Sequence, residues 1–541
     1  MERIKIEKIQ KSLGINTYLD YGKKNIKNYK RYPIVKVNGI VTPLNEEIKE
    51  GADVEYEDIS TKWGSRTYVK TLSVIFAKAF KNLFPDQQAD LNHFIGSGLY
   101  IDFENDFSLT LEDINRIYEE MKVIISNDLD IETDLISKRE AEIIFEPLNN
   151  DVMKLLNTLE DIDIGIVKID GFIDINYSIM APKTSFIEDF KIMQYYPGIL
   201  LITPNNENNF NADNYKEMPK LAKVFQKSTD QYKMLDLNKL SSINKKIIEN
   251  ETEKMIKISE AVFDKSLIDI AEKINEDKDI KIILISGPTS SGKTTFTSRL
   301  KVHLEVLGYS PIMISMDDYF LNRKDTPLDE NGEYDFESPY AVNLDLFNED
   351  MYRLLNQETI QRRRFDFYTG IGSYNNEYIK PTSESIMMIE GIHALNPVIS
   401  HLIPEKNKFK IYLSALNQVN LDAHNRVSTT FSRFIRRSVR DEKFRGYSIE
   451  ETFGFWDKIR KAEELYVFPY QEKADTLLNT ALPYETGIFK KHIKPMLEGI
   501  KEDSIYYNEA RNMLRILDHF ISIEDDSLVN SESILREFIG K

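Results

Sequence analysis

Short apolar runs that alternate with polar residues fill the start of the chain. Residues 34–37 and 40–41 are two such runs, and an Asn-Gly pair separates them at positions 38 and 39. An Asn-Gly pair between strand-like runs is a strong local signal for a tight hairpin. We therefore predict a small β-rich domain over residues 1–62.

The next region mixes helical and strand-like periodicity. Residues 67–84 carry apolar side chains at helical spacing and stop at Pro85, and residues 108–127 repeat this spacing behind several capping side chains. Residues 164–203 return to strand-like runs. The pattern predicts a separate α+β domain over residues 63–205.

The rest of the chain divides into a connector, an α/β domain and a tail. Residues 206–278 are rich in Lys and Glu at helical spacing, which predicts a helical connector. Strand-like runs then alternate with helical segments, and this alternation indicates βαβ units around a parallel sheet. The runs are residues 281–286, 311–315, 385–389 and 409–413. We predict an α/β domain over residues 279–485 and a helical tail over residues 486–541.

Composition narrows the class of protein. A chain of 541 residues, 41% of them hydrophobic, can bury several cores, and roughly three or four domains are expected. The absence of cysteine excludes disulfides, thiolate zinc sites and a cysteine nucleophile. A net charge of −18 argues against general nucleic-acid or acidic-membrane binding. With neither a signal peptide nor an apolar run of roughly 20 residues, we expect a cytoplasmic protein.

One motif points to nucleotide binding. Residues 281–298 read KIILISGPTSSGKTTFTS, which contains G-x-x-x-x-G-K-[ST] between a strand-like run and a helical segment. Its glycines let backbone N–H groups face a phosphate at the positive end of the helix. Lys293 can reach the β- and γ-phosphates, and the Thr294 hydroxyl can ligate Mg²⁺. Such turns also occur without a ligand, but the complete motif favours a nucleoside triphosphate. The predicted nucleotide-binding residues are Gly287, Ser290, Ser291, Gly292, Lys293, Thr294 and Thr295.

Two acidic residues end later strand-like runs. Asp317 follows residues 311–315, and Glu390 closes residues 385–389. The carboxyl ends of parallel strands share one sheet edge with the phosphate-binding loop. Asp317 could accept a proton from a substrate hydroxyl or hold Mg²⁺ through water, although taken alone a helix cap explains it equally well. Glu390 stands where an NTPase carries the acid that orients Mg²⁺.

Five arginines crowd one short segment of this acidic chain. They are Arg433, Arg436, Arg437, Arg440 and Arg445. The first four are spaced by three and four residues, so they share one helical face. A charge run is usually a solvated face. Beside a triphosphate site, we instead favour a lid that closes on phosphates.

Residues 279–485 resemble the uridine kinase/phosphoribulokinase family of P-loop kinases, and most of all its uridine–cytidine kinases. The resemblance is carried, in order, by GPTSSGKTT, SMDDYF, YDFESP, FDFYTG, IEGI and RRSVRDEKFRG. It implies transfer of the γ-phosphate of ATP, with Mg²⁺, to the 5′-hydroxyl of a ribonucleoside such as uridine or cytidine.

The resemblance also implies roles for the residues already singled out. Asp317 becomes the general base, while Lys293, Arg440 and Arg445 act on the transferring phosphates. The implied metal-binding residues are Thr294 and Glu390. A different interpretation is an RNA- or ligand-sensing regulator that uses the loop as a switch. The intact acidic and arginine set argues against it.

Two departures from the family concern the acceptor. Glu337 replaces the shorter aspartate that holds the ribose hydroxyls, where Arg437 would pair with it. Gly370 stands where the family has a histidine that reads the pyrimidine. Phe365 and Phe367 could stack a base, but stacking tolerates any base. The base is therefore left open, and a kinase of a sugar phosphate or pantothenate remains an alternative.

The front of the chain resembles threonyl-tRNA synthetases. Residues 33–60 are similar to their ubiquitin-like TGS domain and residues 65–200 to the editing domain that follows it, through AKAFKNLFP, GSGLYIDFENDFSLTLEDINRIYEEMK and GFIDINYSIMAPKT. The editing domain's zinc-ligand positions fall on Lys70, Val74, Asn176 and Met180, so we expect the hydrolytic centre to be lost. Small-ligand binding, regulation of the kinase and homo-oligomer formation all stay open for this region, and the acidic balance makes RNA binding the least favoured.

Overall fold

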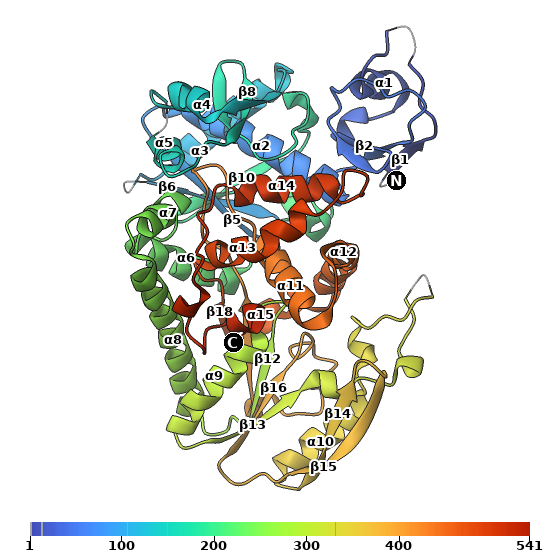
Figure 1. Ribbon diagram of the computed structural model, residues 1–541, viewed down its shortest axis with the longest axis vertical. Coiled ribbons are helices and arrows are strands. Elements are labelled where there is room, and N and C mark those ends of the chain that lie inside the picture. The colour runs from blue at the N-terminus through green and yellow to red at the C-terminus, as the bar shows by residue number, and fades with distance from the viewer. Residues whose placement is uncertain (1–2, 12–13, 105–106, 149, 330–331, 541) are drawn as a thin grey trace.

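The computed structural model describes residues 3–11, 14–104, 107–148, 150–329 and 332–540. The molecule is elongated, with the N-terminal half at one end and a parallel sheet toward the other (Figure 1). Across the described residues, none of the helices combines the length and the apolar character that crossing a membrane requires.

The first domain packs a helix on an antiparallel sheet of four strands in the order β1-β4-β2-β3. Its elements are β1 (Arg3–Ile6), α1 (Tyr18–Asn25), β2 (Ile34–Val37), β3 (Ile40–Thr42) and β4 (Val54–Glu57). The predicted hairpin is confirmed: Asn38 and Gly39 join β2 to β3 with φ of 50° and 84°, as a type I′ turn requires. Phe186 of the next region enters this core, so the two regions are packed together.

The second region contains two antiparallel sheets, in the orders β10-β11-β6-β5 and β7-β8-β9. Its elements are α2 (Lys62–Leu83), β5 (Ala89–Ile95), β6 (Gly98–Phe103), α3 (Leu111–Ser126), β7 (Glu132–Ser137), α4 (Lys138–Phe145), α5 (Asn150–Leu156), β8 (Asp163–Ile169), β9 (Phe172–Ile175), β10 (Lys191–Tyr195) and β11 (Gly198–Ile202). Both predicted helices are present. α2 begins earlier than predicted because Thr61 caps it, and α3 starts behind a capping box of Thr110 and Asp113.

Three helices lead into the α/β domain: α6 (Pro219–Met234), α7 (Leu240–Ile248) and α8 (Thr252–Glu276). α8 runs along the side of the molecule (Figure 1) and buries Phe263, Leu267 and Ile274 in the same apolar cluster as the strands of the parallel sheet. The connector is therefore part of the core and does not behave as a spacer.

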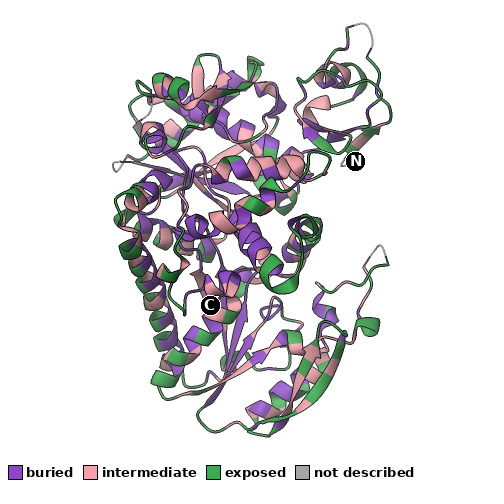
Figure 2. Cartoon of the chain, viewed as in Figure 1, coloured by how far each residue is buried: buried purple, intermediate pink, exposed green. Residues whose placement is uncertain are grey.

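The C-terminal half is built on a parallel sheet of five strands in the order β13-β16-β12-β17-β18. The strands are β12 (Ile282–Ser286), β13 (Ser310–Ser315), β16 (Ser385–Glu390), β17 (Lys408–Ser414) and β18 (Thr476–Asn479). Every residue of β12 is buried, as expected for a strand covered on both faces (Figure 2). The four predicted strands and the predicted α/β fold class are confirmed.

Helices and a hairpin surround this sheet. The helices are α9 (Lys293–Val306), α10 (Leu344–Leu355), α11 (Thr429–Arg445), α12 (Ile449–Tyr466) and α13 (Glu485–Glu498). The antiparallel hairpin of β14 (Ile360–Asp366) and β15 (Ile371–Ile379) lies at the edge of the domain, and much of it is exposed (Figure 2).

The end of the chain folds back over the molecule. It contains α14 (Tyr507–Leu517) and the short α15 (Arg536–Ile539). On α14, Glu509 pairs with Lys62 of α2 at 2.6 Å, and Asn508 donates to the carbonyl of Val41. α15 packs on α11 near the phosphate-binding loop. This last segment therefore connects the N-terminal half with the predicted nucleotide site.

Candidate functional site

The phosphate-binding loop joins β12 to α9 at the carboxyl edge of the sheet. Gly292 has a φ of +81° and caps α9, a conformation that L side chains rarely adopt. A Cβ on Gly287 would lie 2.3 Å from the carbonyl oxygen of Leu413, so that glycine is needed for close packing. Lys293 Nζ donates to the carbonyls of Gly287 and Pro288 at 3.0 and 3.1 Å. Its ammonium is therefore folded onto its own loop.

Unused hydrogen-bonding groups in the loop fit a phosphate. The hydroxyls of Ser290 and Ser291 are buried, and neither has a hydrogen-bond partner within the described part of the chain. Buried polar groups normally find partners, so such orphans are expected where a ligand supplies them. Thr294 follows Lys293 on the first turn of α9 and is exposed. The predicted residues thus suit a nucleotide phosphate and its magnesium ion.

Two carboxylates share the sheet edge with this loop. Asp317 follows β13 and Glu390 ends β16, and β16 lies between β13 and β12. Ser315 donates to Glu390 Oε1 at 3.0 Å, linking the two strand ends. Burial raises the pKa of Glu390 to about 7, with a further contribution from Asp317, while Lys293 lowers it. Desolvation also raises the pKa of Asp317, although its side chain stays exposed, and the charges of Lys293 and Arg445 oppose this.

Arg433 and Arg436 hold the loop from inside the protein. Both are fully buried on α11. Arg433 pairs with Glu463 and donates to the Thr289 carbonyl at 3.0 Å, while Glu463 accepts the Thr289 N–H at 2.8 Å. Arg436 pairs with Glu485 at 2.5 Å. The expectation of a lid is wrong for these two arginines, because their helical face is turned toward buried carboxylates.

The remaining three arginines converge on one buried acid, Asp441. Its ion-pair distances are 3.0 Å to Arg437, 2.8 Å to Arg440 and 3.5 Å to Arg445. Arg437 was expected to pair with Glu337. In the structure, the ion-pair partner of Arg437 is Asp441. Burial raises the pKa of Glu337 to about 7, and the charge of Arg437 opposes this rise.

A residue that the sequence did not single out lies near the backbone of Glu337. His393 lies three residues after Glu390 and is 2% exposed. Burial lowers its pKa to about 4, so it is neutral at physiological pH. Neither ring nitrogen meets hydrogen-bond geometry within the described residues, although the backbone of Glu337 lies near enough to favour protonation. The sequence signal that could have identified His393 is its position three residues after Glu390, the acid that ends β16.

The hairpin places its aromatic residues together but leaves no room for a histidine. Phe365 and Phe367 meet edge to face with ring centroids 5.2 Å apart, and Phe320 packs on both. Gly370 has a φ of +71°, and a Cβ there would lie 2.8 Å from the Cβ of Arg323. Arg323 therefore occupies the space that a histidine at position 370 would need.

The last helix places a carboxylate at the N-terminal end of α9. Glu537 Oε2 accepts from the backbone N–H of Thr295 at 3.2 Å and from its hydroxyl at 3.1 Å. Ile534 packs so closely on Gly292 that a Cβ on that glycine would lie 2.4 Å from its Cδ1. The first N–H groups of a helix that follows a glycine-rich loop attract phosphate, so Glu537 stands in an anion position.

Removing the Glu537 charge should therefore help a nucleotide to bind. We expect Glu537→Gln to lower the Kd for ATP roughly tenfold, because a charge-assisted hydrogen bond contributes about 1.5–3 kcal/mol. Titration calorimetry measures this, with Glu532→Gln, an exposed acid in the same segment, as the matched control. An unchanged Kd would show that ATP does not compete with Glu537.

The pKa values of Glu337 and Glu390 predict how the ligand-free protein responds to pH. Both have folded-state pKa values of about 7 against an ordinary value of 4.5. Between these values the folded state holds protons that the unfolded state has released, so a rise in pH favours unfolding. We expect the Tm to fall from pH 5 to pH 8, and to fall less in Glu337→Gln/Glu390→Gln. If the Tm falls equally with pH in the parent and in the double variant, the raised pKa values of Glu337 and Glu390 are contradicted.

The editing-like region does not present its four predicted positions as one polar centre. Val74 and Met180 are buried in an apolar cluster with Val167. The Asn176 amide donates to the Ser178 carbonyl at 2.6 Å, and Lys70 donates to Asn425 of the C-terminal half. The side chains that stand at these positions are therefore used for packing and for hydrogen bonds, one of which reaches the C-terminal half.

Known proteins match the two halves of the chain separately. The model of the Phosphoribulokinase / Uridine kinase family matches residues 282–484. A uridine kinase of Anoxybacillus flavithermus is 27% identical over 198 residues, which are 36% of this chain and 84% of that protein. A solved structure described as a possible uridine kinase from Bacillus stearothermophilus covers 40% of this chain and 98% of its own, at 19% identity and a TM-score of 0.26.

The N-terminal half matches a different class of enzyme. A threonine–tRNA ligase of Caldanaerobacter subterraneus is 32% identical over 162 residues, which are 29% of this chain. The match spans 25% of that ligase's length. Residues 282–484 are a domain of the phosphoribulokinase/uridine kinase family, joined to an N-terminal region similar to threonine–tRNA ligases.

Proposed function

We propose that this chain is an ATP-dependent kinase that phosphorylates the 5′-hydroxyl of a ribonucleoside, with uridine or cytidine as the expected acceptor. The observation that carries the proposal is the convergence of a base and a phosphate-binding loop on one sheet edge. The Lys293 ammonium interacts electrostatically with both Asp317 and Glu390. A kinase needs this combination, whereas a nucleotide switch has no use for an acceptor base.

The residues divide the chemistry between them. Lys293 leaves its own loop carbonyls to contact the phosphates, and Arg440 and Arg445 lie on the helix beside them. Asp317 accepts the proton of the attacking hydroxyl, and its raised pKa makes it a better base than an ordinary carboxylate. Mg²⁺, when bound, would neutralise charge on the β- and γ-phosphates, and Thr294 and Glu390 would hold it.

The residues proposed to surround the acceptor support a ribose more strongly than a particular base. Glu337 can accept hydrogen bonds from vicinal hydroxyls, and His393 lies beside it as a neutral donor and acceptor. Phe365 and Phe367 offer a stacking surface that suits any base. A kinase of a sugar phosphate or pantothenate would keep the loop and Asp317 but would not need Glu337.

A substrate panel tests the proposal. The full chain is incubated with Mg-ATP and uridine, cytidine, adenosine, guanosine, ribulose 5-phosphate or pantothenate, and both ADP release and product mass are measured. A nucleoside monophosphate as product supports the proposal, and Glu337→Ala should then raise the nucleoside KM. Turnover of a non-nucleoside acceptor alone, or an unchanged KM in Glu337→Ala, would refute the nucleoside assignment.

A further inference from the structure

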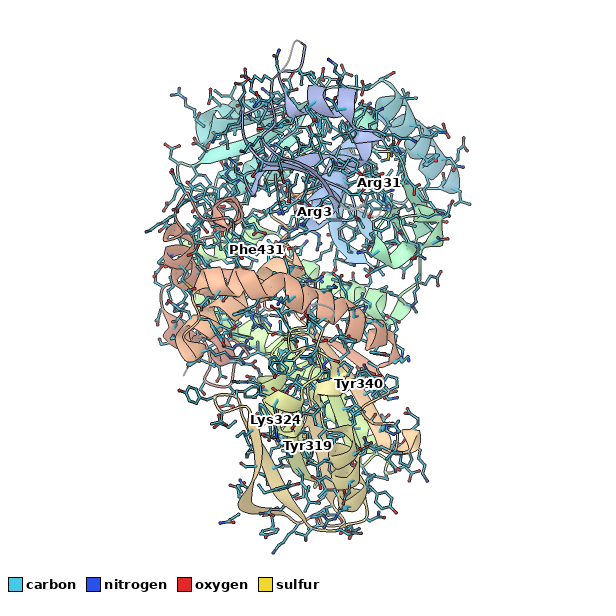
Figure 3. All side chains as sticks on the ribbon, turned by 90° about the vertical axis from the view of Figure 1, so that its right-hand side faces the viewer. Arg3, Arg31, Tyr319, Lys324, Tyr340 and Phe431 are labelled. Atoms are coloured by element: carbon cyan, nitrogen blue, oxygen red, sulfur yellow. The ribbon has the colours of Figure 1, made fainter. Side chains whose placement is uncertain are left out.

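A cavity of about 550 Å³ lies where the N-terminal half meets the C-terminal half. Its walls come from α2, β5, β6, the segment 421–428, α11, α12 and α14, and no residue of the phosphate-binding loop lines it. Phe431, which lines it, is placed between the N-terminal half and the helices of the C-terminal half (Figure 3). Cavities of this size commonly hold small organic ligands.

Three cations that line this cavity form no ion pair with a carboxylate among the described residues. The Arg66 guanidinium lies 5.3 Å from the ring centroid of Trp63, and that of Arg426 lies 5.2 Å from the ring of Phe94. Lys70 Nζ donates to Asn425 Oδ1 at 2.5 Å and to the His424 carbonyl at 3.3 Å. Among the described residues, none of the three cations forms an ion pair within 4 Å.

The acids around the cavity are already engaged elsewhere. Glu509 lines the cavity but pairs with Lys62 at 2.6 Å. Asp174 pairs with His424 at 2.7 Å, and Asp422 accepts two hydrogen bonds from the Asn425 amide. The cavity wall therefore carries an excess of positive charge inside a chain whose net charge is −18.

Keeping the half-buried Lys70 and Arg426 without an ion pair is costly for the folded protein. Lys70 and Arg426 are half-buried, and Arg66 is exposed. Desolvation lowers the pKa of Arg426 to about 10 with no opposing acid, and it lowers the pKa values of Lys70 and Arg66 although nearby acids oppose those shifts. Desolvated charges are normally paired, since an uncompensated one destabilises the fold. A ligand that brings the missing negative charge would relieve this cost.

We propose that the cavity is a second binding site, for a small phosphorylated molecule with a ring-shaped or apolar body. Arg66 and Arg426 supply guanidinium forks that match phosphate oxygens, and Lys70 adds a third positive charge. Trp63, Phe431 and Trp456 supply aromatic surface for the body of the ligand. This site is distinct from the proposed kinase site and does not depend on its activity.

Calorimetry with phenyl phosphate tests the site. The full chain carries Lys293→Ala in every sample, so that anion binding at the phosphate loop is weakened. We expect one saturable site, tighter for phenyl phosphate than for inorganic phosphate, and an affinity at least tenfold weaker in Arg426→Leu and in Arg66→Leu. Arg139→Leu, an exposed arginine on α4, is the matched control and should bind as the parent does.

Thermal unfolding separates a ligand site from a structural role. Without ligand, Arg426→Leu should have a higher Tm than the parent, because an unpaired desolvated charge is removed. Phenyl phosphate should raise the Tm of the parent and leave that of the variant unchanged. The proposal is overturned if phenyl phosphate shows no saturable binding, or if its binding survives both Arg66→Leu and Arg426→Leu.

Discussion

Asp317→Asn is expected to lower kcat for phosphoryl transfer by about 10²–10⁴-fold, the usual contribution of a general base. The amide keeps the size of the side chain but cannot take the proton of the acceptor hydroxyl. Under the proposed function, ATP would contact the loop and α9, which the substitution does not change, so ATP binding should persist. Steady-state kinetics and ATP calorimetry on the same preparation measure the two effects.

The neighbouring acid is the matched control for this variant. Asp318 pairs with Arg364 at 2.9 Å and accepts the Phe365 N–H, so it anchors the hairpin instead of facing the sheet edge. Asp318→Asn should therefore raise the nucleoside KM with a smaller effect on kcat. If Asp317→Asn loses ATP binding and turnover together, Asp317 maintains the site's structure and is not the base.

The parts of the site that could be predicted from the sequence are those with local causes. A glycine-rich turn between a buried strand and a helix specifies its own geometry, so the strand–loop–helix arrangement of β12, the loop and α9 could be predicted. Asp317 and Glu390 end parallel strands, and the ends of such strands meet at one edge. The strand-like pattern was therefore sufficient to predict that Asp317 and Glu390, which are distant in the sequence, lie at the same sheet edge.

The arginines show where local pattern stops being informative. Spacing correctly placed Arg433 and Arg436 on one helical face, but it could not say what that face would meet. Their partners, Glu463 and Glu485, lie 30 and 49 residues further along the chain. Whether a charged face is solvated or buried depends on such pairings, which leave no periodic signal.

The end of the chain presents the same difficulty on a larger scale. Glu537 reaches Thr295 across 242 residues, and the segment before it has little regular structure to predict. The prediction of a helical tail describes α13 and α14 but says nothing of a carboxylate at the N-terminal end of α9. Contacts of this range depend on the fold as a whole.

Arg436→Met is expected to lower the free energy of unfolding of the C-terminal half by about 3–5 kcal/mol, because it leaves a buried charge without its partner. The side chains of Arg436 and Glu485 are 0% and 2% exposed. Arg436 also donates to the Thr480 carbonyl at 2.7 Å and to the Ser290 carbonyl at 3.3 Å. Urea unfolding followed by fluorescence detects the loss, since Trp456 lies in this half of the molecule.

A double variant distinguishes an unpaired charge from lost packing. Arg436→Met/Glu485→Leu removes both charges and should recover most of the stability, because apolar side chains often replace a buried ion pair without loss. Arg353→Met breaks the exposed pair with Glu358 and should cost less than about 1 kcal/mol. A double variant as unstable as the single one would assign the effect to the hydrogen bonds that Arg436 gives to Ser290 and Thr480. The ion pair would then be secondary to the support that Arg436 gives the phosphate-binding loop.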